Sequence, residues 1–300
     1  MLQHERKLER MGIGMNTDCI LCHLRRNIDT ARDLGTPEQL DEFTKGLLEL
    51  YLKVPENTST VWVGPGTEEL YQRIYDTVAD RFAEEKAFSN CFVMERMDQI
   101  RASVEAAQDP VYAGLQHAIL GNYIDFGALH GDISFEKLEG MLAQAEHMDL
   151  DRQVYEKLCR DLEAGGKLLY ITDNAGEIGF DRICAEQIAK RYPHAQITFC
   201  VRGGYALNDA TREDAAAVGI PFPVIDNGNS VPGTLLNVLG DAAKQTMEEA
   251  DVIIAKGMAN AETLLDSGYN IYYAFLVKCI RFEERFQKPK LTPMLVRERD

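Results

Sequence analysis

The stretch KLLYITDNAGEIGFD, residues 167–181, places an acid and an amide directly after a short apolar run. The run at 168–171 predicts a strand, and the residues after Gly179 predict a helix. In open α/β sheets, ligands bind where strands end, beside the N-termini of helices. Asp173 and Asn174 therefore form either an ordinary turn or part of a binding site.

Similar polar clusters follow the other strands expected in the second half of the chain. Strands are predicted at 167–172, 196–201, 223–225, 251–255 and 270–277, with helices between them at 179–191, 208–217, 235–249 and 259–266. Such repetition implies a mostly parallel sheet, whose strands all end at one edge. That edge then collects Asn208 and Asp209, the glycine-rich loop around Gly228, and Lys256 with Asn260. Four such loops together favour a binding site over four separate turns.

The residue types at this edge suit a divalent cation. Asp173, Asn174 and Asp209 offer only oxygen ligands, which fit Mg²⁺ or Mn²⁺ and fit zinc poorly. An ion held by them can bind a phosphate oxygen and lower the pKa of a bound water. Glu177 is the nearest further carboxylate, and we expect it to act as a base or to support the ligands from outside.

Phosphate recognition is predicted at the same place. Lys256 ends a strand and supplies a positive group for a phosphate, and the helix N-termini after Gly179 and Asn208 add backbone N–H donors. A metal, a lysine and helix termini converging on one edge describe phosphoryl transfer or phosphate-ester hydrolysis. We therefore predict Asp173, Glu177 and Lys256 as catalytic residues.

Competing chemistries fit less well. The turn after the first strand lacks the G-x-G-x-x-G pattern of dinucleotide folds, and the chain contains no G-x-x-x-x-G-K-[ST] phosphate loop. Phosphatases that form an aspartyl-phosphate need a second aspartate two residues after the nucleophile, where this chain has Ala175. Asp173 is thus expected to ligate a metal rather than to attack phosphorus.

The first half of the chain is predicted to be helical. Helices are expected at 16–34, 36–54, 67–86, 89–107 and 152–163, with further helices capped by Asp109-Pro110 and by Ser134. Only Val61–Val63 suggests a strand. We therefore expect a helical subdomain at 1–165 and an α/β domain at 166–300, joined in one compact unit with the site at their junction.

Two features of this half carry chemical residue types. Cys19 and Cys22 match C-x-x-C-H, but covalent haem attachment needs export, and no signal sequence is evident. On one helix face the two thiols form a metal-ligand pair, a redox pair or simple core packing, and these alternatives stay open. Asn122 and Asp125, within Gly121–Gly127, belong either to a helix C-cap or to a loop that reaches a neighbouring domain.

Composition excludes some partners and places the chain. Among 300 residues, 48 acidic against 32 basic residues give a net charge of −16, which argues against nucleic acid or an anionic membrane as the main partner. No apolar run approaches ~18 residues, and the charged N-terminus is unlike a signal peptide. We expect a cytoplasmic protein whose seven cysteines are free thiols or ligands.

Taken together, the motifs resemble the domain-of-unknown-function 89 family, described as metal-dependent damage-control phosphatases. The resemblance runs from about Asp18 to Cys279, and the cysteine pair resembles the prokaryotic branch. The matching residues are Gly121–Gly127, Asp173–Glu177, Asn208, Asp209, Thr211, Lys256, Gly257, Asn260 and Glu262.

This resemblance implies a three-layer α/β/α sandwich with a mostly parallel sheet beside a helical subdomain. It implies Mn²⁺, Co²⁺, Ni²⁺ or Mg²⁺ on Asp173, Asn174 and Asp209, with Lys256 contacting phosphate. The implied activity is hydrolysis of a small phosphorylated metabolite, such as a sugar phosphate, by metal-activated water. Candidate substrate-binding residues are Asn122, Asp125, Asn208, Gly228, Lys256, Asn260 and Glu262.

Two other functions remain open at this point. One is an S-adenosylmethionine-dependent carboxyl methyltransferase, an activity proposed for a eukaryotic branch of the family that the chain resembles. The other is a non-catalytic protein that binds a phosphorylated metabolite in the same pocket.

Overall fold

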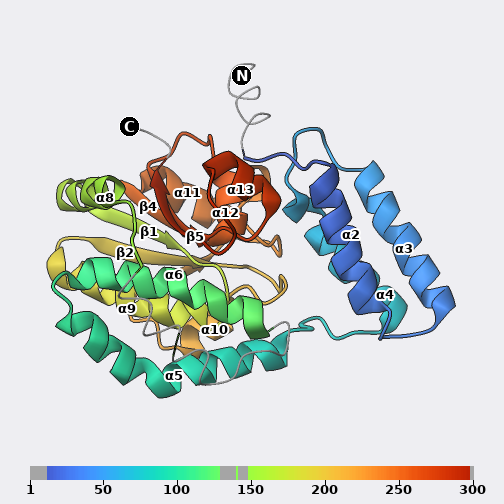
Figure 1. Ribbon diagram of the computed structural model, residues 1–300, viewed down its shortest axis with the longest axis horizontal. Coiled ribbons are helices and arrows are strands. Elements are labelled where there is room, and N and C mark those ends of the chain that lie inside the picture. Colours follow the sequence, from blue (N-terminus) through green and yellow to red (C-terminus); the bar gives the residue numbers. More distant parts are fainter. Residues whose placement is uncertain (1–11, 129–139, 141–147, 298–300) are drawn as a thin grey trace.

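The computed structural model describes residues 12–128, 140 and 148–297, and its centre is a six-stranded sheet (Figure 1). The strand order is β3-β2-β1-β4-β5-β6. The first five are parallel and β6 pairs antiparallel to β5. The strands are β1 (Lys167–Ile171), β2 (Gln196–Val201), β3 (Val224–Asp226), β4 (Val252–Lys256), β5 (Ile271–Leu276) and β6 (Pro293–Arg297). The predicted α/β fold class is confirmed, and β6 is a strand that the sequence pattern did not reveal.

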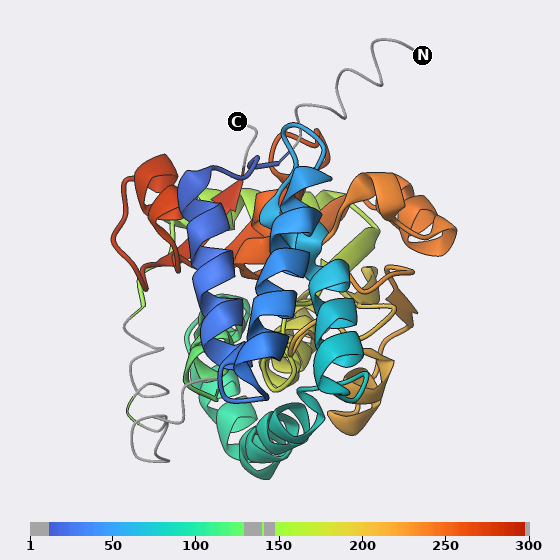
Figure 2. The same ribbon diagram turned by 90° about the vertical axis from the view of Figure 1, so that its right-hand side faces the viewer.

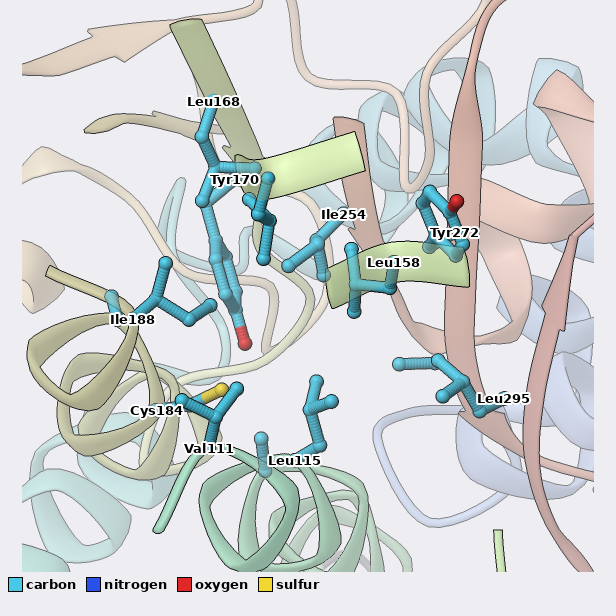
Figure 3. Close-up of a cluster of buried hydrophobic side chains, with 14 of the residues drawn as sticks. Val111, Leu115, Leu158, Leu168, Tyr170, Cys184, Ile188, Ile254, Tyr272 and Leu295 are labelled. Atoms are coloured by element: carbon cyan, nitrogen blue, oxygen red, sulfur yellow. The ribbon is translucent and has the colours of Figure 1, made fainter. Parts of the chain in front are cut away.

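Helices cover both faces of the sheet, because alternate side chains of each central strand point to opposite sides. On one face, Leu168, Tyr170 and Ile254 pack with residues of α6, α8 and α9 (Figure 3). On the other, Leu169, Ile171 and other strand residues pack with α11, α12 and α13. These helices are α6 (Pro110–Ala128), α8 (Arg152–Ala164), α9 (Glu177–Arg191), α11 (Asp241–Glu249), α12 (Gly257–Leu264) and α13 (Ile280–Phe286). The central strands β1, β4 and β5 are therefore almost entirely apolar rather than alternating in polarity.

Outside these layers lie α5 (Ala83–Ala106), which packs on α6 and α9, and the short helices α10 (Arg212–Ala217) and η2 (Leu236–Val238). A separate group, α2 (Thr17–Ala31), α3 (Pro37–Leu52), η1 (Thr60–Val63) and α4 (Gly64–Tyr75), has its own core around Phe43 and Tyr71. Figures 1 and 2 show α2, α3 and α4 side by side at one end of the sandwich.

Hydrogen bonds dock this N-terminal group onto α12. The Ser59 hydroxyl donates to Glu262 Oε1 at 2.5 Å and the Thr60 hydroxyl donates to the same oxygen at 3.0 Å. The Ile13 N–H also donates to the Glu262 carbonyl. Because Glu262 is held by residues about two hundred positions earlier in the chain, it joins the helical group to the sheet edge.

Several predicted elements of the first half are corrected by the structure. Val61–Val63 lies in the 3₁₀ helix η1 rather than in a strand. The helix expected at 67–86 ends at Tyr75, since Asp76 adopts a left-handed conformation with φ 52°, and α5 starts at Ala83. The predicted helix capped by Ser134 lies outside the described residues.

The segment Gly121–Gly127 is also corrected, because it continues α6 and is neither a C-cap nor a loop. In the second half, the helix expected at 208–217 begins only at Arg212, and the one expected at 235–249 is interrupted at Gly240. The proposed division at residue 165 stays a prediction; α5, α6 and α8 pack with the layers of the sheet. None of the described helices combines the length and apolar character needed to cross a bilayer.

Candidate functional site

The loops after β1 and β4 meet where the strand order reverses, between two neighbouring strands whose connections run in opposite directions. This is where open α/β sheets bind ligands. After β1 the chain turns sharply at Gly176, which has φ 74°; an added Cβ there would lie 2.7 Å from Ser89 Cβ. The Gly176 N–H donates to Asn90 Oδ1 at 2.7 Å. Asn90 of α5 thus holds the turn that carries Asp173 and Asn174, a role that the sequence analysis did not identify.

The loop after β2 lies against this turn. The Ala210 N–H donates to the Asp173 carbonyl at 2.7 Å, and the Ala175 N–H donates to the Asn208 carbonyl at 2.9 Å. Asn174 and Asp209 form an isolated antiparallel bridge. Backbone pairing therefore brings together Asp173, Asn174 and Asp209, the three residues proposed as metal ligands.

Asn122 of α6 enters the same cluster from the helical layer. Its Nδ2 donates to Asp173 Oδ2 at 2.9 Å and to Glu177 Oε2 at 2.7 Å. Asn174 Nδ2 donates to the same two oxygens, at 2.9 Å and 3.1 Å. Two buried amides thus bridge Asp173 and Glu177, which fixes the distance between their carboxylates.

Lys256 lies beneath this cluster and is fully buried. Its ammonium group donates to Glu177 Oε1 at 2.5 Å, to Asp181 Oδ1 at 3.0 Å, and to the Ala118 carbonyl at 2.7 Å. Since an ammonium has three protons, each has an acceptor inside the protein. In this arrangement Lys256 neutralises and holds Glu177.

Arg202, which follows β2, is a second buried cation within this cluster and was not singled out as a site residue. Its Nε donates to Asp209 Oδ2 at 2.5 Å and its Nη2 to Asn260 Oδ1 at 3.2 Å. Asn260 Nδ2 in turn donates to the carbonyls of Thr172 and Lys256, at 2.9 Å and 2.7 Å. Asn260 thereby connects the loops after β1, β2 and β4.

Gly257 allows Asp173 to occupy its position. Gly257 has φ 77°, and a Cβ added there would lie 1.9 Å from Asp173 Oδ2. The carboxylate therefore sits directly against the first residue of α12, a space that any side chain would fill. The two residues of the Lys-Gly pair therefore have different roles. Lys256 supplies a positive charge to Glu177, and Gly257 leaves room for the Asp173 carboxylate.

Negative charge exceeds positive charge within the buried cluster. Its ionisable groups are Asp173, Glu177, Asp181 and Asp209 against Lys256 and Arg202. Burial, followed by the charges of Glu177 and Asp209, raises the pKa of Asp173 well above its ordinary value. Burial also raises the pKa of Asp181 to about 7, although Lys256 opposes this shift.

A divalent cation fits this donor set, because it supplies the missing positive charge to oxygen ligands. The buried Asn122 Oδ1 also has no hydrogen-bond partner among the described residues. Asp173, Asp209 and Asn174 would hold the ion, after the Asn174 amide turns its oxygen toward it. As they stand, the described residues contain no group of three histidine, cysteine or acidic side chains arranged to hold a metal.

A cavity of about 380 Å³ opens beside the cluster, between α2, η1 and α4 on one side and the sheet edge on the other. The acidic cluster does not itself line this cavity, but Leu207 and Met258, which are close in the chain to Asp209 and Lys256, do. Lys278, which follows β5, lines it as well. The charge of Lys278 lowers the pKa of Asp173, opposing the effect of burial. Lys278 is therefore a cation that belongs both to the cavity wall and to the surroundings of Asp173.

The remaining predicted residues have different places. Glu262 lines the cavity while bound to Ser59 and Thr60. Asn208 supports the Asp173 turn through its carbonyl. Gly228 packs against the Gly240 backbone, and it is absent from the residues that line this cavity. The Asp125 side chain lies outside the described residues.

Comparison with known proteins gives consistent matches over most of the chain. Residues 15–290 match the model of the damage-control phosphatase ARMT1-like domain. A protein named damage-control phosphatase from Archaeoglobus fulgidus is 31% identical over 272 residues, which cover 87% of this chain and 91% of that protein. An uncharacterised protein from Methanocaldococcus jannaschii is 32% identical over 287 residues, covering 91% and 92%.

Another damage-control phosphatase, from Pyrococcus horikoshii, is 34% identical over 178 residues, covering 58% of this chain and 60% of its own length. Among solved structures, the crystal structure of a domain-of-unknown-function 89 protein from Pyrococcus horikoshii superposes with a TM-score of 0.79 at 25% identity. The match covers 96% of this chain and 100% of that one.

Proposed function

Because the chain belongs to the damage-control phosphatase ARMT1-like domain family, we propose that it is a divalent-metal-dependent phosphomonoesterase acting on a small phosphorylated metabolite. The observation that carries this proposal is the convergence of Asp173, Asn174 and Asp209 in a buried cluster with excess negative charge. Held by Asp173, Asn174 and Asp209, a divalent ion would polarise a phosphate oxygen and lower the pKa of a bound water.

The chain's own residues support this chemistry in distinct ways. Glu177 accepts hydrogen bonds from Asn122, Asn174 and Lys256 and is almost fully buried. With its oxygens so occupied, we assign it the supporting role rather than that of a base: it orients the two amides beside Asp173. Lys256 holds the Glu177 carboxylate in place through an ion pair, and Arg202 orients Asp209.

The cavity supports a small anionic substrate. Its volume of about 380 Å³ lies within the range of small-molecule sites, and its lining sets three acidic residues, Asp18, Glu68 and Glu262, against four basic ones. The basic residues are Arg26, Lys278, Arg281 and Lys290. We infer that Lys278 is the lysine nearest to the phosphate, because it lines the cavity and its charge acts on Asp173. Lys256, by contrast, already donates its hydrogen bonds to buried groups such as Glu177.

Replacing Lys278 by methionine is expected to raise the KM for a phosphate ester by about 10–100-fold, the loss of one charge-assisted hydrogen bond. The melting temperature should change little, since the side chain borders a cavity. Steady-state kinetics and thermal unfolding measure both quantities. Lys290→Met, which removes another cation of the same cavity wall, is the matched control. An unchanged KM in Lys278→Met would show that this lysine does not contact the phosphate.

Metal removal tests the proposed function as a whole. After exhaustive chelation, phosphate release from a panel of sugar phosphates and related esters is expected to cease, and added Mn²⁺, Co²⁺, Ni²⁺ or Mg²⁺ should restore it. Phosphate is measured directly, with unfolding curves showing that the chelated protein stays folded. Full turnover without metal contradicts metal dependence. Tight binding of an ester with no turnover under any metal contradicts the phosphatase assignment and favours the binding function.

A further inference from the structure

We propose that Cys19 and Cys22 form a redox-active dithiol on the wall of the cavity, which closes reversibly into a disulfide by exchange with a low-molecular-weight disulfide. Both residues lie on α2 and line the cavity beside the sheet edge. The pair is chemically separate from the oxygen-rich cluster around Asp173. Only the effect of this disulfide on turnover rests on the proposed function.

The geometry of the pair suits a disulfide. Residues three apart in a helix have Cα atoms roughly 5 Å apart, from the rise and radius of the α-helix. Disulfides require a Cα separation of about 4.4–6.8 Å. Cys19 lies three residues after the N-cap Asn16, whose Oδ1 accepts the Cys19 N–H at 3.0 Å. The pair thus begins in the first helical turn, which has the fewest intrahelical hydrogen bonds and adjusts most easily.

Access favours reaction at Cys22. Cys22 is exposed and Cys19 is half-buried. Arg26 is one helical turn after Cys22 and lines the same cavity, so it places a permanent positive charge near the thiol. His23 contributes no charge at neutral pH, because burial lowers its pKa to about 3. Asp18, one helical turn before Cys22, lines the same cavity with the opposite charge, so the exposure of Cys22 rather than the surrounding charge makes it the attacking thiol.

A third thiol faces the same cavity from the other side. Cys279 is the N-cap residue of α13 and lines the cavity with Lys278. Cys19 and Cys22 of α2 therefore share one cavity lining with Cys279. Cys279 is half-buried and itself has a raised pKa, chiefly from burial. We assign it a spectator role, with the disulfide confined to α2.

The other cysteines have surroundings unlike those of the cavity thiols. Cys184 and Cys200 are buried in the core, and burial raises the pKa of each to about 12. Cys91 is exposed on α5 and Cys159 is half-buried on α8, and neither lines the cavity. Cys91 therefore serves as a solvent-accessible control thiol.

Thiol–disulfide exchange with oxidised glutathione forms this disulfide without a metal. The Cys22 thiolate attacks one sulfur of oxidised glutathione, which forms a mixed disulfide and releases one glutathione thiolate. The Cys19 thiolate then attacks the Cys22 sulfur and releases the second glutathione thiolate. The two protein thiols are oxidised, the glutathione disulfide is reduced to two thiolates, and these take up through solvent the two protons that the protein thiols have lost.

The test treats the full chain with oxidised and reduced glutathione in different ratios, blocks the remaining thiols with iodoacetamide, and maps the peptides by mass spectrometry. We expect a Cys19–Cys22 disulfide that reduced glutathione reverses. Cys19→Ser should instead retain glutathione on Cys22, Cys22→Ser should form no disulfide, and Cys91→Ser should behave as the unchanged protein. Full alkylation of both thiols in oxidising mixtures, or a Cys19–Cys279 bond, overturns the proposal. Stoichiometric zinc in the isolated protein, lost in either serine variant, also overturns it.

The consequence for the cavity is measured separately. Closing the disulfide changes the α2 wall, so oxidised protein should show a several-fold higher KM that reduction restores, whereas Cys22→Ser should be insensitive. An unchanged KM in fully oxidised protein overturns the coupling to the cavity. Peptide mapping needs no turnover, so a failure of the proposed phosphatase activity leaves the disulfide test intact.

Discussion

Replacing Asp173 by asparagine is expected to abolish phosphate release while leaving the protein at least as stable as before. The carboxylate is buried beside Glu177 and Asp209. Burial, and then the charges of these two neighbours, raise the pKa of Asp173. An amide of the same size removes this repulsion, so the free energy of unfolding should rise. The same change removes an anionic ligand for the cation, and we expect kcat/KM to fall by about 10²–10³-fold or more, as when a group that stabilises a transition state is lost.

Kinetics with added metal and chemical unfolding of the same preparation measure both effects. Asp209→Asn is the variant to compare with Asp173→Asn. It also removes a proposed metal ligand, but in addition it breaks the 2.5 Å ion pair with the buried Arg202. We expect Asp209→Asn to lose activity and stability together. Undiminished turnover in Asp173→Asn contradicts its assignment as a ligand, and a marked loss of stability contradicts the charge argument.

Replacing Lys256 by methionine should produce the largest loss of stability among single changes at this site. Methionine fills a similar volume, but Glu177 and Asp181 would lose their shared cation inside the protein. Breaking a buried ion pair by removing one partner costs about 3–5 kcal/mol. For a chain of this size that corresponds to a melting temperature lower by roughly 10 °C.

Thermal and denaturant unfolding measure this loss. Lys278→Met provides the matched control, since it removes the same charge from a cavity wall and should unfold almost normally. Adding Asp181→Asn to Lys256→Met should recover part of the stability, because one of the two uncompensated carboxylates is then neutral. Equal melting temperatures for the two lysine variants would mean that the buried ion pairs contribute little to the fold.

The repeating pattern of apolar runs and helices predicted a mostly parallel sheet with helices between its strands, and the family resemblance added the three-layer arrangement. Parallel strands buried on both faces are short, nearly continuous apolar runs, which the sequence shows directly. Because such strands end at one edge of the sheet, the sequence already predicted that Asp173 and Asp209 lie close together. The antiparallel β6 was missed, because it lies beyond the repeating strand–helix pattern, in a stretch where basic residues and prolines surround a short apolar run.

What each polar group contacts was decided only by the tertiary structure. Lys256 ends β4 as expected, but its partners Glu177, Asp181 and Ala118 come from elements 75 or more residues away, so its role depended on how α6 and α9 pack. The same packing brings Asn122, in the middle of a helix, to Asp173. Likewise, Cys279 meets the cavity of Cys19 and Cys22 because α2 docks on the far end of the chain. Local sequence determines which backbone conformation a segment prefers, whereas hydrogen-bond partners depend on distances that arise only after distant segments have packed.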